Sequence, residues 1–166
     1  MSRTITMDIF DPASVDSAVS EIQEHLRGYS DKIQRKTREL AERLADIGAF
    51  NAHITYANAY YDGHRDVNVT VEQRGENTFA IVASGQTVLF IEFGAGVTYG
   101  YGHPNPMEYG PGTYPGNGHW NDPEGWYIPG PGHIHTYGNP PSMAMYRTGQ
   151  DLRRDLEQIA REVFST

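Results

Sequence analysis

Residues 11–48, DPASVDSAVSEIQEHLRGYSDKIQRKTRELAERLADIG, decide the fold, because they specify one long amphipathic helix. Asp11 can accept hydrogen bonds from free N–H groups of a first helical turn, and Pro12 suits the first helical position, where no N–H is needed. Apolar side chains then recur at steps of four and three. They are Val15, Val19, Ile22, Leu26, Tyr29, Ile33, Leu40, Leu44 and Ile47. We expect a helix from Pro12 to near Gly48, with a kink or a split into two helices as an alternative at Gly28.

A continuous helix of this length measures about 50 Å, which exceeds the diameter of a small globular domain. Part of its apolar stripe must then contact another subunit or the C-terminal helix. The opposite, charged face is interpreted as an ordinary solvated face.

Shorter segments supply the remaining expected elements before residue 94. Residues 67–73 and 78–83 alternate in polarity around a turn and predict an antiparallel hairpin. The run 88–93 is too short and too apolar for its period to distinguish a buried strand from a helix, and we favour a strand. Residues 3–9 alternate, which predicts a short half-buried strand or an extended arm. Residues 49–66 show no sustained period and are interpreted as connecting structure.

A second helix is expected from about Ser142 to Phe164, because Pro140-Pro141 fixes its start and apolar residues follow at helical spacing. The chain has 166 residues, which suits one domain, 1–166, with one modest core. The predicted fold class is α+β: a long N-terminal helix and a C-terminal helix packed on a small antiparallel sheet.

Residues 94–141 differ in kind from the rest and are called the arm below. They contain 12 of the 18 glycines and 9 of the 10 prolines, with no Lys or Arg, so regular structure is mostly excluded. They also carry many Tyr and Trp rings, which solvated linkers rarely do. We expect an extended arm or insertion, ordered by packing of its rings on its own domain or on a neighbour.

Composition narrows the classes of function. The formal net charge of −8 disfavours direct binding to nucleic acid, and the absence of Cys excludes disulfides and thiolate chemistry. No apolar run approaches the roughly 20 residues of a membrane span. No cofactor is expected.

Histidines of the arm are the first candidates for chemistry. His133 and His135 form a His-x-His pair, a spacing that zinc and copper sites use, and nearby carboxylates could complete a site. The competing interpretation is that these histidines hydrogen-bond to backbone in a Gly/Pro-rich loop. The weak metal candidates are His103, His119, His133 and His135, with Glu108, Asp122 and Glu124 as possible carboxylate ligands.

Other patterns give little support to an enzyme. Gly94-Ala95-Gly96 lacks the third glycine and the Lys of a phosphate-binding loop, and no serine lies in a nucleophile-elbow sequence. Glu92 with Glu108 or Asp122 could form a glycosidase pair only at the background rate. The tyrosines of the arm could instead form a platform for sugars or peptides. We therefore assign no catalytic residue.

Glu92 stands out because Phe90, Ile91 and Phe93 surround it in the most apolar stretch of the chain. One interpretation is the polar side of an amphipathic segment, which faces solvent. The other is a charge that pairs with an Arg, within the fold or across a subunit boundary.

The segment Val88-Leu89-Phe90-Ile91-Glu92-Phe93-Gly94-Ala95-Gly96 resembles the "apolar-Glu-Phe-Gly-Thr/Ala-Gly" signature of the Hong-Kong-97-type, or gene-product-ten-like, phage tail-component family. Gly138-Asn139-Pro140-Pro141-Ser142-Met143-Ala144-Met145-Tyr146 before the last helix agrees with the family's second motif. The resemblance covers residues 12–164. The family usually has a shorter segment between the two motifs, and Thr is commoner at Ala95, so the role of the arm is not carried over.

What the resemblance implies is a non-enzymatic structural protein of a tailed bacteriophage or prophage. It would act in tail completion or head–tail joining, as a ring-type homo-oligomer, expected to be a hexamer, that contacts other neck or tail proteins. It would be made in the host cytoplasm and located in the virion. The alternatives are a metal-dependent hydrolase and a monomeric glycan- or peptide-binding module. The expected assembly-interface residues are Phe90, Glu92, Phe93, Gly94, Tyr99, Tyr101, Tyr109, Tyr114, Trp120, Trp126, Tyr127, Asn139, Pro140, Met143 and Tyr146.

Overall fold

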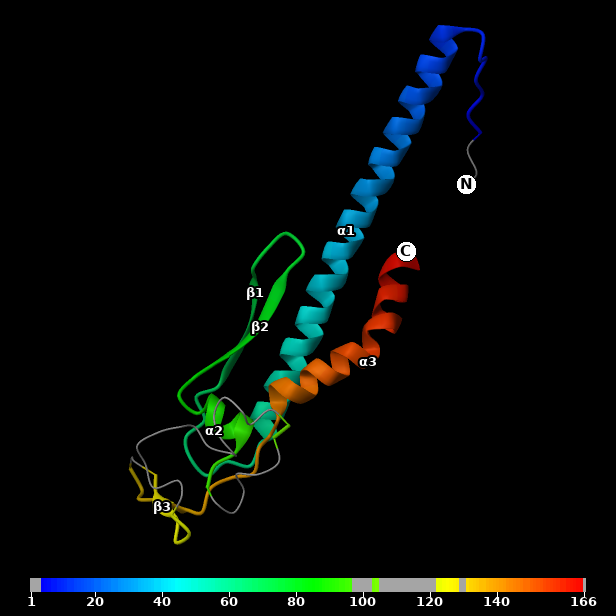
Figure 1. The fold of residues 1–166 in the computed structure, drawn as a ribbon. Helices are drawn as coiled ribbons and strands as arrows, with labels where there is room; N and C mark the ends of the chain where they lie inside the picture. Colours follow the sequence, from blue (N-terminus) through cyan, green and yellow to red (C-terminus); the bar gives the residue numbers. More distant parts are fainter. Residues whose placement is uncertain (1–3, 97–102, 105–121, 129–130, 166) are drawn as a thin grey trace.

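The computed structural model of the protein describes residues 4–96, 103–104, 122–128 and 131–165. It has an α+β fold, as the sequence predicted (Figure 1). The elements, in chain order, are α1 (Pro12–Asn58), β1 (Asn68–Gln73), β2 (Phe79–Ser84), α2 (Val88–Phe93), β3 (Trp126–Tyr127), β4 (His135–Thr136) and α3 (Ala144–Ser165).

Helix α1 begins as the sequence predicts and ends later. The Asp11 side chain accepts a hydrogen bond from the N–H of Ala13, and Pro12 occupies the first turn. The helix then runs through Gly28 without a break to Asn58, a span of about 70 Å. The expected end near Gly48, and the connecting structure assigned from residue 49 to residue 58, are therefore wrong.

The physical reason is the packing of Gly48. A Cβ added to it would lie 2.3 Å from Ile81 Cδ1 and 2.8 Å from Leu152 Cδ1, so this glycine marks the point where α1, β2 and α3 touch most closely. It allows close contact in mid-helix and does not end the helix.

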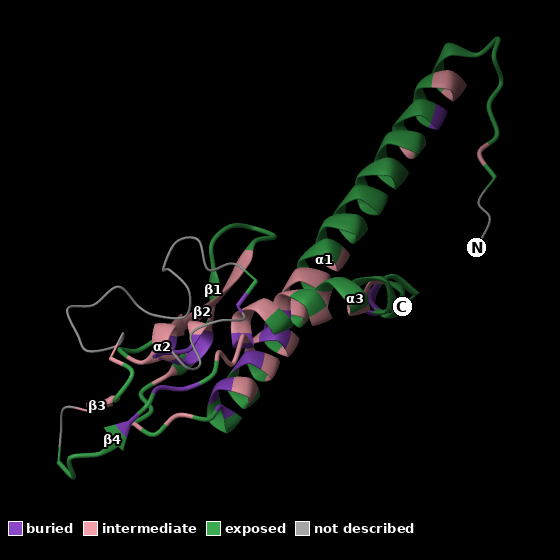
Figure 2. Cartoon of the chain, turned by 60° about the horizontal axis from the view of Figure 1, so that its bottom comes forward, coloured by how far each residue is buried: buried purple, intermediate pink, exposed green. Residues whose placement is uncertain are grey.

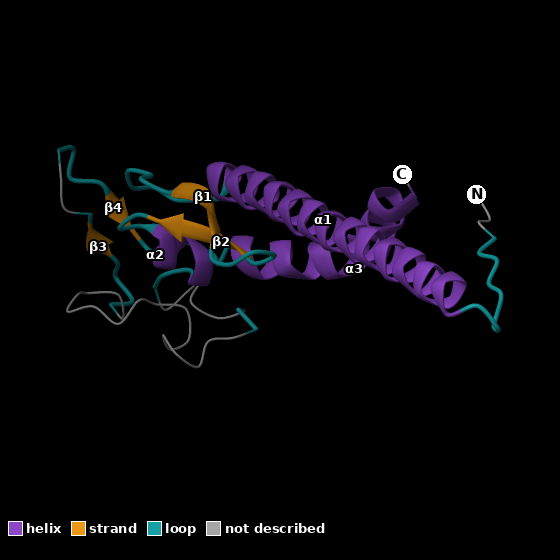
Figure 3. Cartoon of the chain, turned by 90° about the horizontal axis from the view of Figure 1, so that it is seen from above, coloured by secondary structure: helices purple, strands orange, loops and turns teal. Residues whose placement is uncertain are grey.

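The hairpin formed by β1 and β2 confirms the sequence prediction. It is antiparallel, and its register places Val69 opposite Ala83 and Val71 opposite Ile81. Thr78 O accepts the turn N–H groups of Arg74 and Gly75. Figure 3 shows the hairpin lying alongside α1.

The segment 88–93 is a helix, α2, so the favoured strand is wrong. A strand needs a neighbouring strand to pair its backbone groups, and among the described residues β2 pairs with β1 alone. At the N-terminus the described residues 4–8 form no strand and are mostly exposed, in agreement with the extended-arm alternative.

The core lies at one end of the molecule, where the last turns of α1 meet α2 and the start of α3. Its buried side chains are Tyr56, Ala59, Val88, Ile91 and Ala144. Figure 2 shows this burial pattern, with the N-terminal half of α1 almost entirely exposed.

Helix α3 confirms the predicted C-terminal helix and packs back along α1, where Arg43 bonds to Glu162 at 2.5 Å. Among the described residues, no helix combines the length and the hydrophobicity needed to span a bilayer.

Candidate functional site

Helix α2 carries the first of the two motifs, and Asp66 fixes its start. The Asp66 carboxylate accepts the Gln86 N–H at 2.6 Å, the Thr87 N–H at 3.0 Å and the Thr87 hydroxyl. These donors, the Thr87 hydroxyl foremost, hold the pKa of Asp66 below its usual value. The turn that leads into α2 is therefore tied to the chain just before β1.

The end of α2 is tied to the second motif by backbone hydrogen bonds. A helix leaves its last carbonyls without partners, and here residues 139–143 supply the donors. Phe90 O accepts from Asn139 Nδ2 at 2.9 Å. Ile91 O accepts from Ser142 N at 2.8 Å, and Glu92 O accepts from Met143 N at 3.1 Å.

The Glu92 side chain makes the reciprocal connection. Its carboxylate accepts the Met145 N–H at 3.0 Å on Oε2 and the Tyr146 N–H at 3.2 Å on Oε1. These are free amides in the first turn of α3, and a negative charge is favourable there because the helix dipole is positive at this end. One motif thus caps the helix that the other motif begins.

Two side chains complete the surroundings of Glu92, which is 5% exposed. The Tyr56 hydroxyl donates to Oε2 at 3.0 Å, and His103 Nε2 lies 3.4 Å from Oε1. Both carboxylate oxygens therefore have two polar neighbours. We call Tyr56, Glu92, His103, Met145 and Tyr146 the Glu92 junction.

The ionisation of Tyr56 is strongly suppressed. Burial, and then the neighbouring Glu92 charge, raise the pKa of Tyr56 far above its usual value. The hydroxyl therefore stays protonated and keeps donating to Glu92. This pairing suits a structural contact, because the Tyr56 phenol is not poised to release its proton near neutral pH.

His103 attaches the arm to the junction. It is 8% exposed, its ring centroid lies 4.3 Å from that of Phe93, and Tyr146 meets its ring edge-on at 5.7 Å. His103 is thus a described arm residue that is buried against the buried Glu92 side chain.

Two glycines allow the ends of the arm to meet. Ala95 and Asn139 form an antiparallel bridge, with N–H to O distances of 2.9 and 3.0 Å. Gly138 has φ 101°, and a Cβ there would lie 1.9 Å from Ala95 O. Gly94 has φ 81°, and a Cβ there would lie 2.8 Å from Asn139 O. A side chain at either position would push the two motifs apart.

Comparisons with protein-family models, curated proteins and solved structures find no match to this chain.

The structure brings half of the expected interface residues together. Seven of them lie in the Glu92 junction or in the contacts that join α2 to residues 139–143: Phe90, Glu92, Phe93, Gly94, Asn139, Met143 and Tyr146. Glu92, Gly94 and Asn139 are buried inside the single chain, whereas Pro140 is exposed.

The other expected interface residues lie elsewhere or are not described. Trp126 and Tyr127 belong to the small β3–β4 hairpin, where Tyr127 is 64% exposed. Outside the described residues lie Tyr99, Tyr101, Tyr109, Tyr114 and Trp120.

The interpretation that Glu92 faces solvent is wrong, whereas its pairing with an Arg across a subunit boundary stays a prediction. Glu92 is buried, and its partners among the described residues are a phenol, an imidazole and two backbone amides. The physical reason is that free amides of a helix start can replace a cation as the partner of a buried carboxylate.

The metal candidates do not converge in the described part of the chain. His103 adjoins Glu92, while His135 packs edge-on between Tyr127 and Tyr137. His133 is exposed, and His119 lies outside the described residues. No group of three potential metal-binding side chains occurs among the residues that the structure describes.

A small cavity lies beside the junction. It measures about 140 Å³, and Tyr61, Asp62, Phe90, Trp126 and Asn139 contribute to its wall. Ligand-binding pockets usually measure about 300 Å³ or more, so this cavity fits a single side chain better than a sugar or a peptide.

Tyr56 is the junction residue that sequence reasoning missed. Its signal was present, because Ala45, Gly48, Ala52 and Tyr56 continue a helical spacing of three and four. The first three are too small to be counted in an apolar stripe. Yet small residues are what allow α1 to approach its neighbours closely.

Proposed function

We propose that this chain is a non-enzymatic structural protein of a tailed bacteriophage or prophage, which acts in tail completion or head–tail joining through a ring-type oligomer. The observation that carries the proposal is the Glu92 junction. The two motifs behind the family resemblance are joined at two places. Glu92 caps α3 at the junction, and Ala95 pairs with Asn139 beside it.

The chemistry of the junction supports a structural role for its carboxylate. A general acid or base needs a free oxygen within reach of a substrate, but each Glu92 oxygen already has two polar neighbours. The Tyr56 hydroxyl stays protonated, so it cannot serve as a nucleophile.

The shape of the molecule supports assembly. The junction anchors the C-terminal end of α1 while the other end projects into solvent with exposed apolar side chains (Figures 1 and 2). Side chains such as Leu26 and Tyr29 gain free energy only when another surface covers them. An assembly protein provides such a surface on its neighbours.

The test is a gene deletion in a phage or inducible prophage that encodes this chain, with the wild-type gene supplied from a plasmid as the control. Electron microscopy of the lysate should show filled heads together with unjoined or incomplete tails, and the plasmid should restore infectious particles. Normal infectious particles from the deletion strain would refute the proposal.

A further inference from the structure

We infer that residues 15–36 of α1 form a self-association surface, on which two copies of the chain pair as antiparallel helices in a short coiled coil. The inference does not depend on a phage role. It uses a part of α1 that the rest of the chain leaves largely uncovered, with Ala18 buried and Val15 half-buried near its start, and that is separate from the Glu92 junction.

The spacing of the apolar residues is that of a coiled coil. Val15, Val19, Ile22, Leu26, Tyr29 and Ile33 follow at steps of four, three, four, three and four. Alternating steps of four and three repeat every seven residues, as in Val19, Leu26 and Ile33, and such a heptad repeat keeps a narrow stripe facing one partner helix over several turns. We call these six residues the seam.

The seam continues into the packed half of α1 at the same spacing. Leu40 and Ile47 follow Ile33 at intervals of seven, and both are half-buried. One pattern therefore serves two environments. Its second half packs against other elements of the same chain, while its first half is exposed and can bind a partner.

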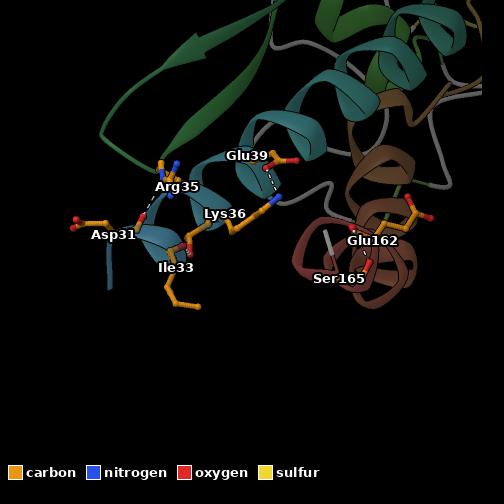
Figure 4. A network of polar contacts seen from close by, with 8 residues as sticks. Asp31, Ile33, Arg35, Lys36, Glu39, Glu162 and Ser165 are labelled. Atoms are coloured by element: carbon orange, nitrogen blue, oxygen red, sulfur yellow. Dashed lines mark hydrogen bonds and ion pairs between the residues drawn. The ribbon is translucent and has the colours of Figure 1, made fainter. Parts of the chain in front are cut away.

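The first half of the seam is uncovered. Leu26 is 59% exposed and Tyr29 is 63% exposed. Every residue from Ile22 to Arg35 is exposed. Figure 4 shows the Ile33 side chain pointing away from the hairpin, whereas Lys36, one turn later, reaches Glu39. The boundary between uncovered and covered helix lies between Arg35, where the exposed run ends, and Leu40, which is half-buried.

The charges along this helix indicate which partner fits and in which direction. Residues 11–24 carry four acidic and no basic side chains: Asp11, Asp16, Glu21 and Glu24. Residues 27–38 carry one acidic side chain, Asp31, and five basic ones: Arg27, Lys32, Arg35, Lys36 and Arg38. The two blocks therefore have formal charges of −4 and +4.

A second copy in the antiparallel direction complements this pattern. Its basic block lies over the acidic block of the first copy, and the reverse holds at the other end. A parallel pair in register would place like charges side by side, which is unfavourable. A two-fold axis near Glu24 places the seam residues opposite one another, Val15 with Ile33, Val19 with Tyr29 and Ile22 with Leu26, and meets the requirement that such an interface be self-complementary.

The first experiment measures the mass of the full chain in solution, by sedimentation equilibrium from about 1 µM to 1 mM. We expect a monomer–dimer equilibrium that Leu26→Ser weakens by about tenfold or more, because a buried leucine is lost from the seam. Gln34→Ser is the matched control, since Gln34 is exposed on the same helix and outside the seam. It should leave the equilibrium unchanged.

Leu26 is exposed in the single chain, so the variant should fold, and circular dichroism verifies this. A wild-type chain that stays monomeric over the whole concentration range would overturn the inference. The seam would then be expected to bind a different protein. Equal dimerisation of Leu26→Ser and wild type would also overturn the inference.

The second experiment tests direction, using the absence of native cysteine. Val19→Cys and Tyr29→Cys variants are treated with a short bismaleimide, alone and as a mixture. Antiparallel pairing predicts cross-linking mainly in the mixture, because position 19 of one copy then lies near position 29 of the other. Efficient cross-linking of Val19→Cys with itself would indicate parallel pairing and refute the proposed interface.

Discussion

The two halves of α1 belong to one continuous helix and follow one apolar spacing, yet they have opposite environments. Nothing lies within 4 Å of a Cβ added at Gly28, whereas at Gly48 such a Cβ would lie 2.3 Å from Ile81 Cδ1. The packed half is held by α3, by the hairpin and by the Glu92 junction. The projecting half is held by its own backbone hydrogen bonds. Helical periodicity therefore predicts the helix, but it does not reveal which parts of the helix are covered by the same chain.

The largest effect is expected at the packed end, from Glu92→Ala. The change removes the cap of α3 and leaves the buried Tyr56 hydroxyl without its acceptor, which should lower the free energy of unfolding by about 3 kcal/mol. Glu92→Gln keeps the shape and one acceptor oxygen and should lose less. Denaturant titration of both variants measures the difference.

Glu76→Ala is the matched control for this prediction, because it removes the same charge from an exposed turn. A loss for Glu92→Ala no greater than that for Glu76→Ala would show that the junction does not hold the packed end together.

A smaller loss is expected from Gly48→Ala. The added methyl group gains helix propensity but must displace the Ile81 and Leu152 side chains, so we expect a net loss of about 1–2 kcal/mol. Thermal unfolding followed by circular dichroism measures it. A gain in stability would mean that the contact among α1, β2 and α3 is looser than described.

The same substitution in the projecting half, Gly28→Ala, should have the opposite sign. It meets no neighbour and gains helix propensity, which stabilises this half by about 0.5–1 kcal/mol. Hydrogen exchange should slow for backbone amides around residue 28 and stay unchanged near residue 48. Faster exchange around residue 28 would contradict a free-standing helix.

The smallest effect concerns Asp66 and is limited to acid. Its pKa is lowered in the folded chain, so its contribution to stability is present above its unfolded value, near 3.8, and is lost as the pH falls through the lower folded value. The difference in melting temperature between wild type and Asp66→Asn should therefore be constant near neutral pH and shrink below about pH 4. A difference that grows in acid would contradict this sign.

Elements with a sustained period were predictable from the sequence. The stripe from Val15 to Ile47 predicts α1, and the alternation of 67–73 and 78–83 predicts the hairpin. The last turns of α1 were missed because Gly48 and Ala52 mark close packing instead of a hydrophobic stripe. Helix α2 was missed because its six residues, five of them apolar, do not fill two helical turns and show no period.

Most residues of the candidate site could be predicted from the sequence, but Tyr56 and the contacts that join these residues could not. The Glu-Phe-Gly and Asn-Pro-Pro motifs were both singled out, as was Glu92 itself. The partners of Glu92 at Met145 and Tyr146 are backbone amides more than 50 residues away in the chain. A backbone amide leaves no signature in a sequence, because every residue except proline has one.

The bridge between Ala95 and Asn139 has a consequence for how this protein can vary. Since the chain leaves and re-enters the core at one point, the stretch between these residues can change in length while its two ends stay in place. Doubling the length of a flexible loop with fixed ends costs only about 0.6 kcal/mol. Changes in the length of the arm that leave His103 at the Glu92 junction are therefore tolerable to the core, and the arm can diversify while the residues that anchor it are kept.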